Sequence, residues 1–307
     1  MATIAQPTAS ARPLEGKIGI VTGGSRGIGA AIAQNLAEKG CSLLLNYTSA
    51  SSTQRALDLC AQLSSTHGIR CYAVQADLAD PPTAISKIMS SAKEHFATGD
   101  GLKIDILINN AGIAGDRLLN DPVRGSIDAE LFDRQYKVNV LAPLLLTQAV
   151  APYLPRDRSG RIVNVSSVSA SMGFEGQSVY AGTKGALEAM TRVWARELGD
   201  RATVNSINPG PVIGDMYWAA GEGFWKIMQG WQDNTPGSNL NVEPGFTGTG
   251  EERLTEEQAR TIKEKMGGRR PAFTDEIAGI VGMLCTRDGQ WCTGSVVCAN
   301  GGLRMSP

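Results

Sequence analysis

Tyr180 and Lys184 lie four residues apart in the segment SVYAGTKGALEAM, which runs from Ser178 to Met190. Positions i and i+4 of an α-helix share one face, so a helix here would place a phenol beside an ammonium. Such a pair could exchange a proton with a bound ligand. The segment is otherwise made mostly of small residues. Taken alone, it is better explained by a closely packed helix with an exposed lysine and a half-buried tyrosine.

A glycine-rich turn near the amino-terminus has the composition of a phosphate site. The apolar run Ile18 to Thr22 leads into TGGSRGIG, which places Gly23, Gly27 and Gly29 before a helical pattern. Glycines allow close backbone approach, and a helix N-terminus offers free N–H groups to a pyrophosphate. The motif alone is a weak indication because glycine turns before helices are common. It is not a P-loop, since no Gly-Lys-Ser/Thr follows.

Two further polar motifs end apolar runs. INNAG, Ile108 to Gly112, closes the fourth run, and IVNVSSVSA closes the fifth run with hydroxyl groups. Ligands of open parallel sheets bind at the carboxyl ends of strands where the winding direction changes. Tyr180 follows the second motif at the start of the next helical pattern, so these groups are expected to meet there.

Short apolar runs alternate with helical patterns along the chain. The runs are continuous rather than alternating, which is typical of parallel strands buried on both faces. We therefore expect an α/β fold with a seven-stranded parallel sheet and helices on both faces. The expected strands are Ile18–Thr22, Ser42–Asn46, Cys71–Gln75, Ile104–Asn109, Arg161–Val165, Thr203–Ile207 and Ser295–Cys298. The expected helices are Ala30–Lys39, Thr53–Ser65, Pro82–Phe96, Ala129–Tyr153, Ser178–Leu198 and Asp275–Thr286.

One stretch interrupts this alternation and predicts a lid. Residues 1–13 are expected to be a flexible segment and residues 14–307 a single domain, with a lid-like insertion at about 219–270. The insertion is too long for an ordinary connection. It contains a helix with a capping box, Thr255 with Gln258, and a glycine stop at Gly267. The large apolar residues within the insertion and just before it would cover a substrate or, alternatively, pack into the domain or a subunit interface; they are Trp218, Phe224, Trp225 and Trp231.

Composition limits the partners and the compartment. Lys plus Arg number 29 and Asp plus Glu 30, so no overall field favours nucleic acid or an anionic membrane. No run approaches the roughly 18 apolar residues of a membrane span, and the amino-terminus lacks a signal-peptide pattern. The six cysteines show no C-x-x-C spacing, which suggests free thiols in a reducing compartment. We expect a cytoplasmic protein with a small-molecule partner. His67 and His95 lack ligand partners, so we expect no metal.

Together these motifs resemble the short-chain dehydrogenase/reductase family, in the soluble single-domain branch that includes 3-oxoacyl carrier-protein reductases and fungal ketone reductases. The resemblance covers roughly Leu14 to Leu303. It implies a Rossmann-type doubly wound sheet. The matching elements are T-G-x-x-x-G-x-G at Thr22–Gly29, N-N-A-G at Asn109–Gly112, Asn139 in the long helix, Ser167 thirteen positions before Tyr180, Y-x-x-x-K at Tyr180–Lys184, and NPG at Asn208–Gly210.

The resemblance implies a role for each of four residues. Tyr180 would be the general acid/base, Ser167 a donor to the substrate carbonyl, Lys184 the group that lowers the Tyr180 pKa and holds the nicotinamide ribose, and Asn139 part of a proton relay. A phenol acting near pH 7 needs its pKa lowered by about three, which corresponds to about 4 kcal/mol. A nearby ammonium and an oxidised nicotinamide could supply this. Ser166 and Ser169 are rival hydroxyls without the family spacing.

The same resemblance implies a dinucleotide site, for which we predict NADPH. An acidic residue at the end of the second strand would favour NAD, but Asn46, followed by Tyr47 and Thr48, stands there. Arg26 would lie near a 2′-phosphate or remain a solvated turn residue. Asp77 would meet the adenine or cap a turn. The expected cofactor-binding residues are Gly23, Ser25, Arg26, Gly27, Ile28, Gly29, Asn46, Tyr47, Thr48, Asp77, Leu78, Asn109, Ala111, Gly112, Tyr180, Lys184, Pro209, Gly210 and Val212.

The expected function is reduction of a ketone by NADPH, on a bulky apolar or aromatic substrate. Two alternatives stay open: an NAD(P)-linked alcohol dehydrogenase working oxidatively, and a non-catalytic NADPH-binding sensor or scaffold. A pure binder has no need of both Ser167 and Tyr180. The family often has a Thr after NPG that contacts the cofactor, whereas this chain has Gly214. The long helices resemble those that pair across two-fold axes in the family, so we expect a homo-oligomer, either a dimer or a tetramer.

Overall fold

The computed structural model describes residues 12–240 and 254–305, and the segment expected to be flexible lies almost wholly outside this range. Seven parallel strands form one sheet in the order β3-β2-β1-β4-β7-β8-β9. This confirms the predicted sheet. Its strands are β1 (Ile18–Val21), β2 (Ser42–Tyr47), β3 (Cys71–Gln75), β4 (Ile106–Asn109), β7 (Gly160–Val165), β8 (Ala202–Ile207) and β9 (Val296–Val297).

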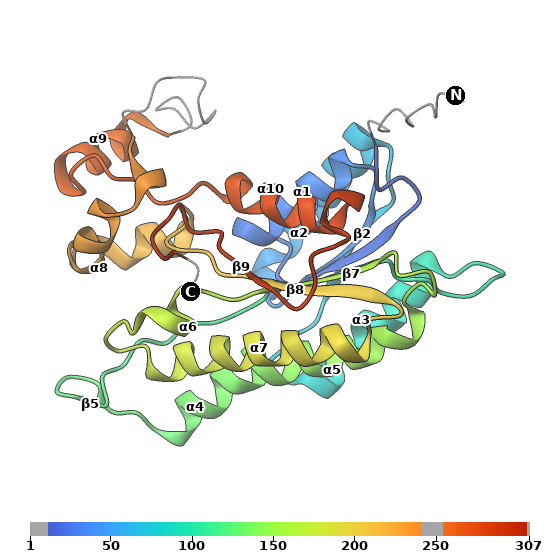
Figure 1. The fold of residues 1–307 in the computed structure, drawn as a ribbon, viewed down its shortest axis with the longest axis horizontal. Coiled ribbons are helices and arrows are strands. Elements are labelled where there is room, and N and C mark those ends of the chain that lie inside the picture. The colour runs from blue at the N-terminus through green and yellow to red at the C-terminus, as the bar shows by residue number, and fades with distance from the viewer. Residues whose placement is uncertain (1–11, 241–253, 306–307) are drawn as a thin grey trace, which may run out of the picture.

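Helices cover both faces of this sheet (Figure 1). One layer contains α1 (Gly27–Glu38), α2 (Thr53–His67) and α10 (Thr274–Cys285), and the other contains α3 (Pro81–Phe96), α5 (Ala142–Val150) and α7 (Ser178–Glu197). The remaining α-helices in the described part of the chain are α4 (Ala129–Tyr136), α6 (Ser169–Met172), α8 (Asp215–Asp233) and α9 (Glu256–Lys265).

The strands are buried on both sides because successive residues serve two cores. Val21 of β1 packs in the cluster beneath α1 and α10, whereas Ile20 packs in the cluster beneath α3, α5 and α7. Side chains alternate across a strand, so a strand covered on both faces has no polar side to expose. This is why the strands are continuous apolar runs in the sequence.

The winding direction changes between β1 and β4. From β1 the chain adds β2 and β3 on one side, and β4 then pairs with β1 on the other side. The carboxyl ends of β1 and β4 therefore flank the crevice where open α/β sheets bind ligands. The glycine turn and the NNAG motif follow these two strands.

The helix expected over residues 129–153 is interrupted. α4 ends at Tyr136, a π-helical turn spans Lys137–Leu141, and α5 begins at Ala142. Pro143 contributes to the break, because a proline has no N–H to donate to the carbonyl of Asn139, four residues before it. Single π turns of this kind often mark functional sites.

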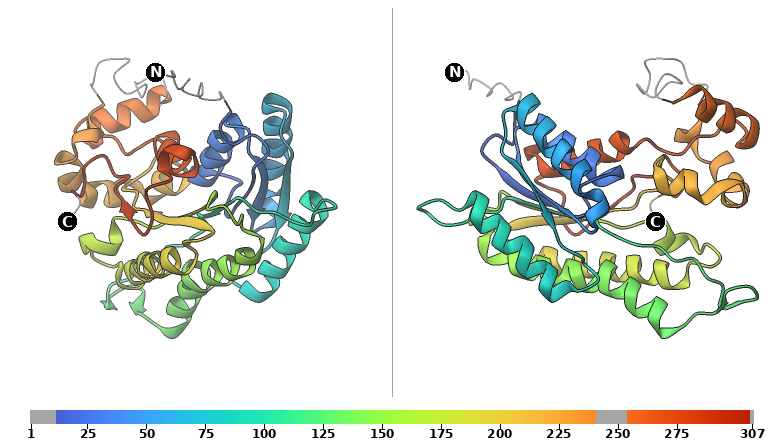
Figure 2. Two further views of the ribbon diagram at one scale, coloured as in Figure 1. Left: turned by 45° about the vertical axis from the view of Figure 1, so that its right-hand side comes forward. Right: turned by 180° about the vertical axis from the view of Figure 1, so that it is seen from behind.

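The segment after β8, which contains α8 and α9, forms a separate small lobe at one end of the molecule, coloured orange in Figure 2. Helix α8 begins at Asp215, four residues before the expected insertion, and contains a kink at Gly221. The capping box of Thr255 with Gln258 is present at α9, and Gly267 follows this helix with a positive φ. Residues 241–253 lie outside the described part.

Most aromatic residues of this lobe pack within it. Trp225 is buried with Tyr217, and its indole N–H donates to the Tyr217 carbonyl at 3.1 Å. Trp218 and Phe224 are partly buried against the same cluster. Only Trp231 of the four predicted aromatics is exposed, and it contacts Phe174 edge-on. Three of the four aromatic residues therefore follow the alternative expectation, in which they pack within the domain and do not cover a substrate.

A small hairpin and a short helix had no signal in the sequence. The hairpin consists of β5 (Asn120–Asp121) and β6 (Gly125–Ser126), and α6 follows β7. All three elements are too short for a period to be detected. They lie at the end of the molecule that also carries α8 (Figure 1).

Candidate functional site

The first loop after β1 is fastened to the loop after β4. The Thr22 hydroxyl accepts hydrogen bonds from the backbone N–H groups of Asn110 and Ala111, both at 3.0 Å. The Asn110 side chain donates to the carbonyl of Thr22 at 2.8 Å. These contacts hold the glycine turn and the NNAG motif together across the crevice. Neither Thr22 nor Asn110 was among the expected site residues, although both lie within the motifs that indicated the site.

The glycine turn has the shape of a phosphate site. A Cβ on Gly29 would lie 2.2 Å from the Gly23 carbonyl oxygen, so no side chain fits there. Gly23 and Gly27 have positive φ, and a Cβ on Gly27 would meet nothing within 4 Å. The first turn of α1 has no acidic residue, and Arg26 at its N-cap makes no side-chain cap. The N-terminus of α1 is therefore open to an anion. Ser25 is buried in the turn, and Ile28 packs against the core.

Tyr180 and Lys184 lie one turn apart on α7, as expected. The Lys184 Nζ is 5.6 Å from the centre of the Tyr180 ring. Lys184 is buried, and its Nζ donates to the carbonyl of Val165, the last residue of β7, at 2.8 Å. The end of the strand thus fixes the lysine beside the tyrosine. The small residue Gly182, between Tyr180 and Lys184, lets α4 approach closely, since a Cβ on Gly182 would lie 2.9 Å from the Tyr136 hydroxyl of α4.

Ser167 is the hydroxyl that reaches Tyr180. A side-chain hydrogen bond with Ser167 is one of the influences on the Tyr180 pKa. Ser167 also donates to the Ser169 hydroxyl at 2.9 Å. Ser166, the rival one position earlier, is buried and donates to a carboxylate oxygen of Glu188 at 2.7 Å. Ser167 is therefore the serine that contacts Tyr180, whereas Ser166 contacts Glu188.

Asn139 belongs to the same cluster through the π-helical turn. Its amide accepts from the Ile113 N–H at 2.9 Å and donates to the Ile113 carbonyl at 2.8 Å. It also donates to the Thr183 hydroxyl at 3.1 Å, a contact that the sequence did not indicate. A Cβ on Gly112 would lie 3.3 Å from the Lys184 Nζ and 3.4 Å from the Asn139 Oδ1. The NNAG loop therefore passes closely over these two side chains.

Burial dominates the protonation of the central pair. It raises the pKa of Tyr180 to about 12, with Asp116 acting in the same direction and the Ser167 hydrogen bond against it. It lowers the pKa of Lys184 to about 8, against the attraction of Glu188. Lys184 does not lower the Tyr180 pKa in this structure, where burial, which destabilises the phenolate, has the largest effect. The phenol is therefore protonated at neutral pH.

The residues at the ends of β2 and β3 differ in accessibility. Asn46 is fully buried, and its Nδ2 donates to the Ala76 carbonyl at 2.9 Å. Tyr47 and Leu78 are also buried, whereas Thr48 is exposed. Asp77 is exposed and accepts from the Ala79 N–H at 3.0 Å, which is the turn-capping contact considered as its alternative role.

A cluster of charges surrounds the start of α8. The carboxylate of Asp215 lies 3.7 Å from the Arg26 guanidinium and 3.4 Å from that of Arg55, on α2. All three side chains are largely exposed. Two arginines from distant parts of the sequence thus converge beside the glycine turn. Arg55 had no motif to identify it.

The other expected cofactor residues lie around the crevice in different ways. Asn109 is buried and donates to Asn164 at 2.8 Å and Thr147 at 3.2 Å, so its side chain links β4 to β7 and α5. The Pro209 carbonyl accepts from the Val168 N–H at 3.0 Å. Gly210 lies close to Asn300, and Val212 forms a bridge with Ala272. Ala111 and Gly112 lie in the loop fastened by Thr22.

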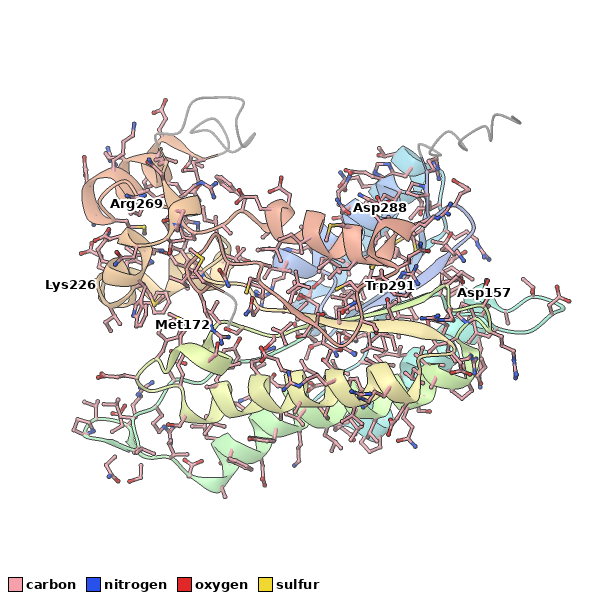
Figure 3. The ribbon with its side chains drawn as sticks, in the orientation of Figure 1. Asp157, Met172, Lys226, Arg269, Asp288 and Trp291 are labelled. Atoms are coloured by element: carbon pink, nitrogen blue, oxygen red, sulfur yellow. The ribbon has the colours of Figure 1, made fainter. Side chains whose placement is uncertain are left out.

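A separate cavity of about 480 Å³ lies at the other end of the sheet, where Lys17, Asp105 and Arg161 stand near the amino ends of strands. Figure 3 labels Trp291 and Asp157 near this end, and Met172 and Lys226 near the end with α8. Tyr180 does not line this cavity. The candidate site is the crevice at the carboxyl ends of the strands, because ligands of such sheets bind there.

The chain belongs to the short-chain dehydrogenase family, whose model, described as short chain dehydrogenase, matches residues 17–223. It is therefore an NAD(P)-dependent oxidoreductase that acts on CH–OH or C=O groups. Within the part of the chain that the structure describes, no helix is long and apolar enough to cross a membrane.

Two fungal relatives match over almost their whole length. An L-xylulose reductase of Aspergillus niger is 67% identical over 300 residues, covering 96% of this chain and 99% of the relative. An L-xylo-3-hexulose reductase of Hypocrea jecorina is 56% identical over 303 residues, with coverage of 96% and 99%. Among solved structures, a blue fluorescent protein from a metagenomic library in complex with NADPH has a TM-score of 0.73 at 32% identity, covering 95% of this chain and 100% of its own. A short chain dehydrogenase from Burkholderia cenocepacia in complex with NADP has a TM-score of 0.72 at 30% identity, with coverage of 95% and 99%.

Proposed function

We propose that this protein reduces the ketone of an open-chain sugar, with NADPH as the hydride donor and Tyr180 as the proton donor. The observation that carries the proposal is the protonated Tyr180 phenol with Ser167 and Lys184 beside it. These residues lie at the carboxyl ends of the strands, where the glycine turn also lies. The names of the two fungal relatives support a sugar ketone as the substrate.

The residues of the site have separate tasks in this reaction. Ser167 donates a hydrogen bond to the carbonyl oxygen and orients it toward Tyr180. NADPH supplies the hydride that reduces the carbonyl carbon. The Tyr180 O–H bond breaks as a new O–H bond forms on the former carbonyl oxygen, which leaves a secondary alcohol. The Lys184 ammonium stabilises the phenolate that remains.

The protonated phenol of Tyr180 is the form that reduction needs as its proton donor. A phenol with a pKa of about 12 keeps its proton at neutral pH and is ready to donate it. The reverse reaction would need the phenolate as a base. Burial disfavours that charge, and the Lys184 ammonium beside Tyr180 favours it.

NADPH is favoured by the charges around the glycine turn. Arg26 and Arg55 supply two guanidiniums where the adenosine end of a dinucleotide would lie, and guanidiniums bind phosphate through charge-assisted hydrogen bonds. Two structural relatives are described in complex with NADPH or NADP. The glycine turn fits the pyrophosphate, since side chains are excluded at Gly29 and absent at Gly27.

The expectation of a bulky apolar substrate is not favoured. It rested on four aromatic residues needing a surface to cover, and three of them pack within the lobe of α8 and α9. A cytoplasmic location remains part of the proposal, supported by six free cysteines.

Purified protein with NADPH and L-xylulose tests the proposal, with loss of NADPH absorbance as the measurement. We expect rapid oxidation of NADPH, a slower reaction with NADH, and formation of the pentitol. Tyr180→Phe is the control for background oxidation. Turnover of hydroxyl-free ketones but of no ketose would refute the sugar substrate, and binding of NADPH without turnover of any ketone would favour the sensor alternative.

A further inference from the structure

Among the buried side-chain oxygens that have no hydrogen-bond partner within the described residues are Oδ1 of Asp116 and Oε1 of Gln177, near Tyr180, and Oε1 of Gln135. The side chains of Asp116 and Gln177 bind each other through their other atoms, since the Gln177 Nε2 donates to the Asp116 Oδ2 at 3.2 Å. The pair therefore presents one carboxylate oxygen and one amide oxygen that still need donors.

Such oxygens are uncommon in a folded protein. Most buried polar atoms are hydrogen-bonded, and an unpaired acceptor costs free energy because it has lost its water. An ionised aspartate such as Asp116 can only accept hydrogen bonds and has no proton to donate. Its sequence neighbour Arg117 does not neutralise it, because the Arg117 guanidinium binds Asp128 at 2.8 Å. The unpaired oxygens indicate that a donor from outside the chain belongs here.

The pair lies beside the reacting group. Gln177 is the N-cap of α7, three residues before Tyr180. Asp116 lies in the loop after β4, close enough to act on the Tyr180 charge. Backbone contacts join these two loops, since the Arg117 N–H donates to the Gly176 carbonyl at 2.7 Å. Gln135 supports the first loop by donating to the Gly115 carbonyl at 3.2 Å.

We infer that Asp116 and Gln177 form the hydroxyl-recognition site for the substrate, accepting hydrogen bonds from hydroxyl groups next to the carbonyl that Tyr180 protonates. This inference rests on the proposed function. An open-chain ketose carries a hydroxyl on every carbon except the carbonyl carbon, so it supplies donors on both sides of the ketone. A hydroxyl-free ketone supplies none and would leave both oxygens unpaired.

The test compares two five-carbon substrates that both carry a ketone at C2, of which the second has another ketone at C3. L-xylulose carries hydroxyls, and 2,3-pentanedione does not. Asp116→Asn removes the charge but keeps the shape, and Gln177→Met removes the acceptor but keeps the length. Glu175→Gln, a change at an exposed carboxylate in the same loop, is the matched control. NADPH binding and circular dichroism check that each variant is folded.

We expect kcat/KM for L-xylulose to fall about 10-fold to 100-fold in Asp116→Asn, as for a lost hydrogen bond to a charged group, and about 5-fold in Gln177→Met. The value for 2,3-pentanedione should change less than about 3-fold. Removing Asp116 also alters the charge near Tyr180, but that effect applies to both substrates, so the ratio of the two kcat/KM values isolates hydroxyl recognition. Glu175→Gln should leave the ratio unchanged.

Other outcomes overturn the inference in distinguishable ways. Equal losses on both substrates would assign the pair to positioning of Tyr180 or of the loops. No loss on either substrate would show that the hydroxyls bind elsewhere, with the proposed function intact. If wild-type protein reduces the diketone but not L-xylulose, the sugar substrate and this inference both fail.

Discussion

Replacing Asn46 with aspartate should destabilise the protein instead of switching it from NADPH to NADH. A carboxylate at the end of β2 favours NAD in this fold when it faces the ribose. Asn46, however, is fully buried, and its Nδ2 faces three backbone carbonyls, those of Ala76 at 2.9 Å, Tyr47 at 3.3 Å and Val74 at 3.5 Å. Asn46→Asp would place a carboxylate oxygen against these acceptors. The buried carboxylate would lose its hydrogen bonds to water, and the three carbonyl groups could not replace them because they have no proton to donate.

The expected cost is about 3 to 5 kcal/mol, the range for an uncompensated buried charge. With an unfolding entropy of about 2.1 cal/mol/K per residue, this corresponds to a Tm about 5 to 8 °C lower. The introduced carboxyl would have a folded-state pKa above its unfolded value, because its protonated form can donate to the Ala76 carbonyl. The loss should therefore be small near pH 4, grow by about 1.4 kcal/mol per pH unit above that, and level off once the pH passes the folded-state pKa.

Thermal unfolding at several pH values measures this effect, and Thr48→Asp is the matched control. Thr48 follows Asn46 by two positions and is exposed, so a carboxylate there remains hydrated. We expect Thr48→Asp to keep the wild-type Tm and to lower NADPH affinity. A stable Asn46→Asp variant with improved kcat/KM for NADH would refute the assignment of Asn46 to the strand interior.

Four further predictions concern the site and the assembly. Tyr180→Phe should lower turnover about 100-fold or more while NADPH binding, followed by fluorescence, stays unchanged; retained turnover would exclude Tyr180 as the acid. Reduction should decline above about pH 8, where Lys184 loses its proton, and Lys184→Arg should remove that decline; a pH profile that is the same in both proteins would contradict it. Arg55→Ala should weaken NADPH binding but not NADH binding, and Asp215→Asn should tighten NADPH binding about 2-fold to 5-fold, as for an exposed pair; equal changes for both coenzymes would remove these residues from the phosphate site. Light scattering should show a dimer or tetramer formed through the α4–α7 face, where Phe132 is exposed, and a monomer at micromolar concentration would contradict this.

The fold could be predicted because its signals are local and repeated. Seven apolar runs and the intervening helical periods indicate a parallel sheet directly, and the motifs follow strands that parallel pairing brings to one edge. The π-helical turn at Asn139 could not be predicted, because it depends on a proline four residues later within an otherwise regular helical period. The convergence of Arg26, Arg55 and Asp215 joins three segments that no motif connects. The direction of a side chain at a strand end, as at Asn46, is likewise set by packing.

The central pair shows why spacing alone was insufficient to predict chemistry. The four-residue interval places Tyr180 and Lys184 on one face, but their protonation depends on burial, which raises one pKa to about 12 and lowers the other to about 8. Burial of Lys184 is possible because the Val165 carbonyl at the end of β7 accepts its hydrogen bond. The strand end therefore does more than position the lysine: it keeps an ammonium in a site that would otherwise disfavour it. Proton donation by Tyr180 leaves a phenolate beside that ammonium, so the burial that holds the proton in place before reaction also strengthens the attraction that stabilises the charge afterwards.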